Sequence, residues 1–83
     1  MLSMNLRMYT VEQVSKLFGC LPTDVEMLSE AGCLNPIQIG NKSMYSYEDI
    51  KNFQRNYTGL DVSTRAKARE AFMIVTRRRR KNE

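Results

Sequence analysis

Two short helical patterns, each closed by a glycine, constrain the fold of this 83-residue chain more than any other feature. Thr10 followed three residues later by Gln13 is a capping box, which predicts the start of a helix. Gly19 can end that helix. Between them, apolar residues recur at i, i+3, i+6 and i+7 on one helical face. They are Val11, Val14, Leu17 and Phe18.

A second helix is expected after a turn of about three residues. Pro22 suits the first position of a helix, and Asp24 puts a negative charge in its first turn. Gly32 ends it, and its apolar stripe is Val25, Leu28 and Ala31. Two short helices joined by a turn that contains glycine are the helix-turn-helix pattern.

The next segment predicts a minimal β-hairpin and a third helix. Residues 37–39 alternate apolar and polar side chains, residues 40–43 form a tight turn, and residues 44–46 return as a second strand. Ser46 is expected to cap the helix that follows, with Glu48 and Asp49 in its first turn. The apolar stripe of that helix is Tyr47, Ile50, Phe53 and Tyr57.

A last helix is expected from about Val62 to Arg80, capped by Asp61 or Ser63. Its apolar stripe is Ala68, Ala71, Phe72, Ile74 and Val75. This stripe can pack back on the body or form an interface with a partner, such as a second copy, because an exposed apolar stripe marks a partner surface. The expected organisation is a lead-in over 1–8 that is flexible or forms a short edge strand, a domain over 9–58, and a basic helix and tail over 59–83. The fold class is mostly α with a small β-hairpin.

Charge divides the chain in two. Residues 1–61 carry five Lys/Arg and seven Asp/Glu, a net of −2, whereas residues 62–83 carry eight and two, a net of +6. A basic end on a mildly acidic body is typical of a protein that binds a polyanion. Neutralising about six to eight phosphates would give a salt slope of roughly −5 to −7 on B-DNA. The alternative is a solvated, charged helix end that adds only solubility.

Several function classes are not expected from the composition. No apolar run approaches the length of a membrane helix, and the start lacks the apolar core of a signal peptide, so a cytoplasmic protein is expected. Cys20 and Cys33 are too few for a zinc site in a chain without histidine, so no metal or cofactor is expected. The chain shows no catalytic or phosphate-loop motif, so neither enzymatic activity nor a small-molecule substrate is expected.

The order of these segments resembles the excisionase-like branch of the MerR-type winged helix-turn-helix family. The matching pieces are residues 9–19, the helix that ends at Glu30-Ala31-Gly32, residues 36–40 and residues 45–50, which together span about half of the chain. The family includes phage and transposon excisionases, small terminase subunits and transcription regulators. The resemblance implies double-stranded DNA as the partner, with the second helix in the major groove and the hairpin as a wing against the backbone or the minor groove.

The resemblance points to DNA contacts from the second helix and the wing. These residues are Pro22, Thr23, Asp24, Glu26 and Met27, then Asn41, Lys42 and Ser43. The charge pattern adds the basic residues Lys16, Arg65, Lys67, Arg69, Arg77, Arg78, Arg79, Arg80 and Lys81. The second helix departs from the family because its exposed charges are carboxylates, which repel phosphates. Base contact, protein docking and a solvated face all remain open for it.

The leading interpretation is an excisionase-like architectural or transcription-regulatory factor from a phage or mobile element, active in DNA recombination or regulation. Several copies would bind together, since one module with few base-reading side chains has limited specificity. One alternative is a module that docks a recombinase or another phage or host protein through the acidic second helix or the basic last helix. Another is a small-terminase-like packaging subunit. The scaffold does not decide among these programmes.

Overall fold

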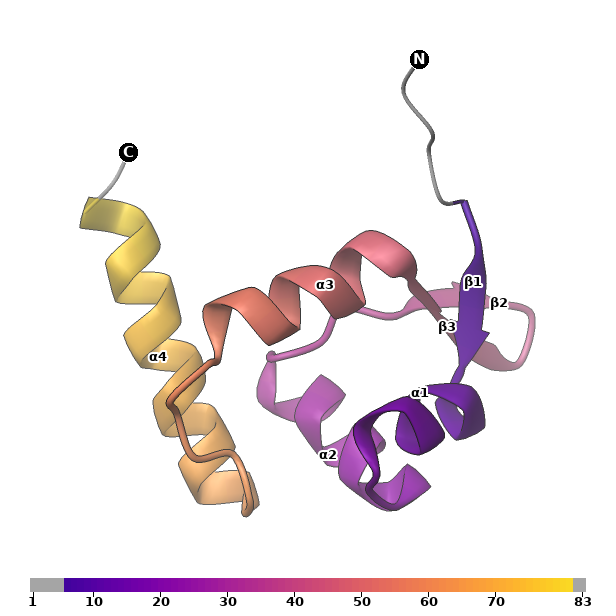
Figure 1. Ribbon diagram of the computed structural model, residues 1–83, viewed down its shortest axis with the longest axis horizontal. Coiled ribbons are helices and arrows are strands. Elements are labelled where there is room, and N and C mark those ends of the chain that lie inside the picture. Colours follow the sequence, from indigo (N-terminus) through magenta and orange to yellow (C-terminus); the bar gives the residue numbers. More distant parts are fainter. Residues whose placement is uncertain (1–5, 82–83) are drawn as a thin grey trace.

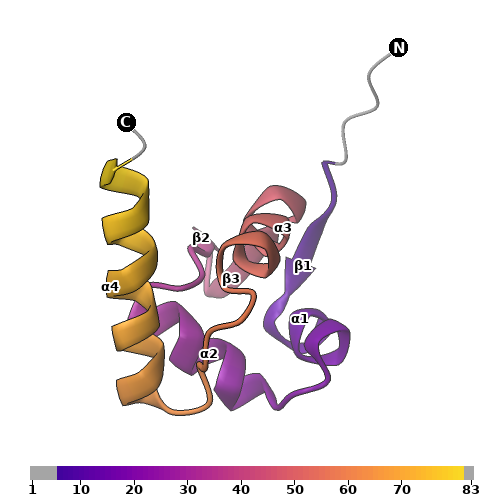
Figure 2. The ribbon, with the colours of Figure 1, turned by 60° about the vertical axis from the view of Figure 1, so that its left-hand side comes forward.

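The computed structural model describes residues 6–81, which form four helices and a three-stranded antiparallel sheet (Figure 1). In chain order the elements are β1 (Met8–Thr10), α1 (Val11–Phe18), α2 (Pro22–Ala31), β2 (Ile37–Ile39), β3 (Lys42–Ser46), α3 (Tyr47–Asn56) and α4 (Arg65–Lys81). The strand order is β1-β3-β2. The result is one small compact α/β domain, in which α4 packs along α2 (Figure 2).

The signals at the ends of the first two helices are confirmed. The Thr10 hydroxyl accepts from the Gln13 amide at 3.1 Å, and the Gln13 side chain accepts from the Thr10 amide at 2.9 Å. Gly19 and Gly32 end α1 and α2 in the left-handed conformation. Asp24 accepts from the Leu21 amide at 3.0 Å, which ties down the start of α2.

Replacing Thr10 with alanine removes the hydrogen bond that its hydroxyl accepts from the Gln13 amide, and leaves the one from the backbone amide of residue 10 to the Gln13 side chain. We expect a loss of about 1 kcal/mol in the free energy of unfolding and a fall in Tm of about 4–8 °C. Thermal melts followed by circular dichroism measure this change. Thr10→Ser is the control, because it keeps the hydroxyl. A serine variant as unstable as the alanine variant would show that the methyl group, and not the cap, matters here.

The hairpin turn is shorter than predicted. It is only Gly40–Asn41, with Gly40 at φ 61°, so Lys42 and Ser43 belong to β3 and pair with Ile39 and Gln38. A two-residue turn with a positive φ at its first position matches the twist of the flanking strands. Of the two alternatives for the chain before α1, the structure shows the edge strand, since β1 lies at the edge of the sheet and Met8 pairs with Ser46. Residues 1–5 of the predicted lead-in lie outside the described residues.

The core gathers residues from all four helices and from β3. Its buried apolar members are Val14, Val25, Leu28, Ala31, Cys33, Leu34, Tyr45, Ile50, Tyr57, Ala68, Ala71 and Val75. The Tyr45 hydroxyl lies 2.5 Å from the Ser29 hydroxyl, so the buried phenol keeps a hydrogen-bond partner. Phe53 stacks between Phe18 and Tyr57, with ring centroids 5.3 and 5.0 Å away.

The predicted stripe of α1 is wrong at one position. Leu17 is 59% exposed, whereas Ser15 is buried and donates to the carbonyl of Glu12 at 2.7 Å. A buried serine is tolerated because its hydroxyl donates a hydrogen bond to a carbonyl group on the preceding turn of its own helix.

The last helix starts later than predicted and belongs to the same core. It begins at Arg65, and the Thr64 hydroxyl caps it by accepting from the Lys67 amide at 3.2 Å. Ala68, Ala71 and Val75 are buried, with Ala68 fully inaccessible. Alanine lets the helices approach closely, and the Cys33 thiol reaches the Ala68 carbonyl at 3.4 Å. The predicted boundary between 58 and 59 therefore divides segments that share one core.

This packing corrects the predicted interface on α4. Ala68, Ala71 and Val75 face the body of the same chain, so they offer no surface to a partner. Ile74 is half-buried, and Phe72 keeps 37% of its surface exposed. Of the predicted interface residues, only these two still present apolar surface to the outside.

Candidate nucleic-acid interface

The exposed face of α2 is mainly acidic. Thr23, Glu26 and Glu30 are exposed and stand at i, i+3 and i+7, which places them on one face of the helix. Two carboxylates and one hydroxyl form this stripe. It can accept hydrogen bonds from donors, but its charge opposes a close approach of phosphates.

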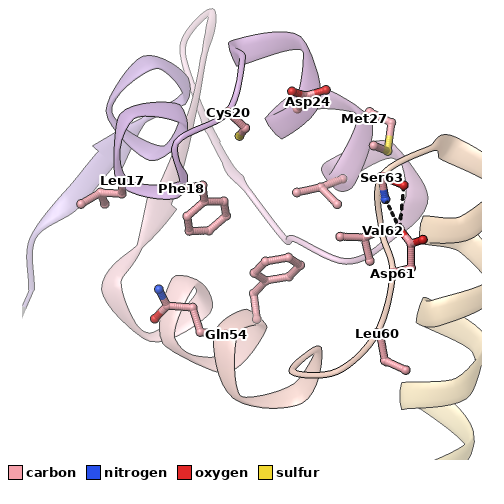
Figure 3. Close-up of a pocket in the computed structure, with 12 residues that line it drawn as sticks. Leu17, Phe18, Cys20, Asp24, Met27, Gln54, Leu60, Asp61, Val62 and Ser63 are labelled. Carbon is pink, nitrogen blue, oxygen red and sulfur yellow. Dashed lines mark hydrogen bonds between the residues drawn. The ribbon is translucent and has the colours of Figure 1, made fainter.

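Two predicted DNA contacts lie away from that stripe. Asp24 and Met27 line an apolar hollow of about 640 Å³, together with Val62 and Asp61 of the segment before α4 (Figure 3). One carboxylate oxygen of Asp24 already accepts from the Leu21 amide. Asp24 therefore serves the start of α2, and Met27 contributes to the packing between α2 and the rest of the body.

The hairpin places its lysine beside carboxylates. Lys42, Asn41 and Ser43 line a hollow of about 300 Å³ together with Glu12 and Glu26. The Ser43 hydroxyl accepts from the Gln38 side chain at 2.7 Å. Two carboxylates outnumber one ammonium group here, so the surface between α2 and the hairpin attracts phosphates weakly.

The basic residues at the start of α4 are partly neutralised. The guanidinium of Arg65 contacts Glu30 at 2.5 Å, and the ammonium of Lys67 lies 3.2 Å from Asp61. Both pairs are exposed, and exposed pairs contribute between 0 and about 1 kcal/mol each. Arg69 on α4 and Lys16 on α1 are exposed and form no ion pair among residues 6–81.

The carboxylate of Asp61 has an unusual pKa. Hydrogen bonds from the Ser63 hydroxyl at 2.6 Å and the Ser63 amide at 2.9 Å, followed by the Lys67 ammonium, lower the pKa of Asp61 from 3.8 to about 2. A lowered pKa means that the folded state favours the ionised form. Asp61 therefore adds stability above its ordinary pKa of 3.8, and this stability is lost as the pH falls toward 2.

We expect the Asp61→Asn variant to melt at a lower temperature than the unchanged chain at pH 5 to 7. The difference should shrink below a pH of about 4 and vanish only below a pH of about 2, where Asp61 is protonated in the folded state as well and both chains carry a neutral group at this position. Melting curves across this pH range test the expectation. A constant difference at every pH would mean that the loss comes from hydrogen-bond geometry and not from charge.

The far end of α4 groups three unpaired positive charges. The side chains of Arg77, Arg78 and Arg79 are exposed, and none of them forms an ion pair in the described part of the chain. Arg80 and Lys81 continue the helix, but their side chains lie outside the described residues. Cations at the end of a helix also interact favourably with its dipole. Three consecutive unpaired cations make this end a candidate site for an anion.

Three residues that the sequence did not single out lie next to this end. Asn52 and Asn56 of α3 and Thr76 of α4 line a hollow of about 100 Å³, together with Arg79, which the charge pattern already indicated. Uncharged polar residues on a helix surface match no motif. One signal in the sequence was their spacing, since Asn52 and Asn56 stand at i and i+4 and therefore share a face.

The two cysteines, Cys20 and Cys33, are free thiols. Cys33 is buried and Cys20 half-buried, and burial is the main cause that raises the pKa of each thiol. Among residues 6–81, no group of three His, Cys, Asp or Glu side chains gathers where it could bind a metal ion. In that same part of the chain, no helix combines the length and apolar character that a membrane crossing requires.

Comparison of the chain with protein-family models, with curated proteins and with solved structures found no match. What the site can do therefore has to be argued from its own residues. The arrangement offers unpaired guanidinium groups at one end of α4, amide and hydroxyl groups beside them, and an acidic stripe on α2. The guanidinium groups can bind an anionic polymer through charge, and the amide and hydroxyl groups beside them can add hydrogen bonds.

Proposed function

We propose that this chain binds double-stranded DNA, with the basic end of α4 as its main contact to the phosphate backbone. The observation that carries the proposal is which cations of α4 already have an ion-pair partner and which do not. Arg77, Arg78 and Arg79 are exposed without an ion-pair partner among residues 6–81, whereas Arg65 and Lys67 already have partners. Unpaired surface cations gain most from a polyanion, because each neutralised phosphate releases counterions.

The proposed scaffold is a winged helix-turn-helix. The order of a helix, a short turn, a second helix, a two-stranded hairpin and a third helix supports this assignment. In it, α2 is the helix nearest the bases and the β2–β3 hairpin is the wing. Thr23 is the one exposed side chain of the α2 stripe that reads bases without a charge penalty. Sequence preference is then weak, and backbone contacts dominate.

Such a protein acts by shaping or occupying DNA and not by reading a long site. The proposal is therefore an excisionase-like architectural or regulatory factor, in which several copies bind side by side. Cooperative binding supplies the specificity that one module of this size lacks.

A salt titration of the full chain on a random-sequence duplex tests the proposal. The exposed, unpaired arginines of α4 are Arg69, Arg77, Arg78 and Arg79, and Arg80 and Lys81 follow them in the sequence. Together they correspond to about four to six phosphates and a slope of log K against log salt of roughly −4 to −5. The absence of binding at low salt would sink the proposal. Binding that does not depend on salt would remove the α4 charges from it.

A second candidate is a protein-docking module. The observation that favours it is the apolar hollow of about 640 Å³ in Figure 3, which is lined in part by Leu17, a side chain that is 59% exposed. Exposed apolar surface around a hollow marks a contact site for another molecule. If the full chain fails to bind DNA, this surface becomes the first to test, with Leu17→Ser in a two-hybrid or cross-linking assay against candidate partners.

A further inference from the structure

We infer that the hollow between α3 and α4 holds one phosphate group of the bound DNA, with Arg79 as its charged ligand and Asn52, Asn56 and Thr76 as its hydrogen-bonding groups. The inference rests on the proposed DNA binding and extends it. It assigns one defined phosphate site to α3 and α4, apart from the face formed by α2 and the hairpin.

The first argument is the geometry of the four side chains. Asn52 and Asn56 stand one turn apart on the same face of α3, and Thr76 and Arg79 stand at i and i+3 on α4. All four line one hollow of about 100 Å³, a space that suits one small tetrahedral group and not a larger ligand. Polar side chains from two helices thus line one hollow.

The second argument is the state of these polar groups. Asn52, Asn56 and Thr76 are half-buried, and among residues 6–81 their side chains take part in no hydrogen bond. Among the described residues no buried side-chain nitrogen or oxygen lacks a hydrogen-bond partner, so these groups are open to water, which a phosphate can replace. A phosphate has enough acceptor oxygens to satisfy two amides, one hydroxyl and a guanidinium at once.

The third argument concerns charge. Burial raises the pKa of Tyr57 above its ordinary value and the Cys33 thiol adds to this, whereas the positive charge of Arg79 opposes both. The guanidinium of Arg79 is exposed but lines the hollow, so its positive charge acts on groups that line the hollow with it. An anion held in the hollow is attracted by this charge.

One carboxylate also lines the hollow. Both oxygens of Asp49 accept from Asn35, from its amide at 2.9 Å and from its side chain at 3.1 Å. Asp49 lies in the first turn of α3, three residues before Asn52 on the same face of the helix. Its charge repels an anion in the hollow, and the guanidinium of Arg79 has to offset this repulsion.

The site can be separated from the general charge of α4 by two neighbouring arginines. Arg79 lines the hollow, whereas Arg78 is exposed outside it. We expect Arg79→Gln to weaken binding of a random-sequence duplex about tenfold, because it removes a charge-assisted hydrogen bond. Arg78→Gln removes the same charge and should weaken binding only about two- to threefold. Equal losses would overturn the phosphate site and leave the proposed DNA binding intact.

A second pair of variants acts on α3. Asn52→Asp places a carboxylate in the hollow, and Gln54→Glu adds the same charge to α3 outside it. We expect the first change to weaken DNA binding at least about fivefold more than the second, because a carboxylate in the hollow repels the phosphate directly. Melting temperatures of both variants check that the fold is kept. Equal effects of the two substitutions would contradict the site.

Side-chain amide signals in NMR spectra of the full chain distinguish the remaining outcomes. On titration with the duplex, and more weakly with inorganic phosphate, the signals of Asn52 and Asn56 should shift before those of Asn35 and Asn41. If the chain binds no DNA but these signals respond to inorganic phosphate, the proposed function fails and the hollow is a site for a free phosphate group. If neither probe shifts them, the site does not exist.

Discussion

Replacing Arg77, Arg78 and Arg79 together with glutamine should weaken binding to a random-sequence duplex about 100-fold at low salt. Each lost phosphate contact also removes about 0.9 from the salt slope, so the slope should flatten by roughly 2.7. The loss should be nearly the same on every sequence, since backbone contacts position a protein without reading bases. Fluorescence anisotropy at several salt concentrations measures both quantities.

The matched control lies on the same helix. The double variant Arg65→Gln, Lys67→Gln also removes positive charge from α4, but these two side chains already pair with Glu30 and Asp61. We expect this variant to weaken binding less than about threefold, because paired cations release few counterions. A loss per residue as large as at the far end would show that only net charge matters and that no part of α4 is a preferred contact.

Deleting α4 would not be an equivalent experiment. Ala68, Ala71 and Val75 fill part of the core against α2, so a chain that ends at Asp61 loses buried apolar surface as well as charge. A domain of this size has little stability to spare. Surface substitutions at the far end of α4 change the charge and leave the core as it is.

The parts of the fold that the sequence predicted are those with a local cause. The capping box at Thr10, the glycine at the end of each of the first two helices and the Ser46 cap all act within one helical turn. Their hydrogen bonds depend on residues three or four positions away, so the pattern alone determines them. These positions were predicted correctly.

The predictions were wrong or left open where contacts between distant segments determine the structure. The burial of Ser15 in place of Leu17 depends on how α1 lies against its neighbours, and the choice between a flexible lead-in and an edge strand depends on the pairing of β1 with β3. Turn length in the hairpin follows from strand register, which the residues of the turn do not determine alone. Periodicity describes one element at a time and therefore cannot predict these contacts.

The candidate interface was even less accessible from the sequence. Its basic run is visible as composition, but which cations are free depends on pairs such as Arg65 with Glu30, which join residues far apart in the chain. Asn52 and Asn56 are candidates for phosphate binding because α4 brings Arg79 to the hollow that they line, which the sequence alone does not show. Charge could be counted from the sequence, whereas charge that is already neutralised could not.

The position of α4 leads to the second large effect, at Gly32. This residue ends α2 with φ at 98°, a conformation that suits glycine. A Cβ atom there would lie 3.0 Å from the ring of Phe72, which packs over it from α4. We expect Gly32→Ala to cost about 2–4 kcal/mol of unfolding free energy, from backbone strain together with the steric conflict. Denaturant unfolding measures the loss.

Gly19 provides the comparison that separates the two causes. It also has a positive φ, at 69°, but a Cβ atom there would meet nothing within 4 Å. Gly19→Ala should therefore cost only the strain of the left-handed conformation, about 1 kcal/mol. The excess at Gly32 should be partly relieved by Phe72→Ala, because that change removes the ring and leaves the strain, giving a coupling energy of about 1 kcal/mol in a double-mutant cycle. Additive losses at Gly32 and Phe72 would mean that this contact does not hold α4 in place, and the position of the basic end would then depend on Ala68, Ala71 and Val75 alone.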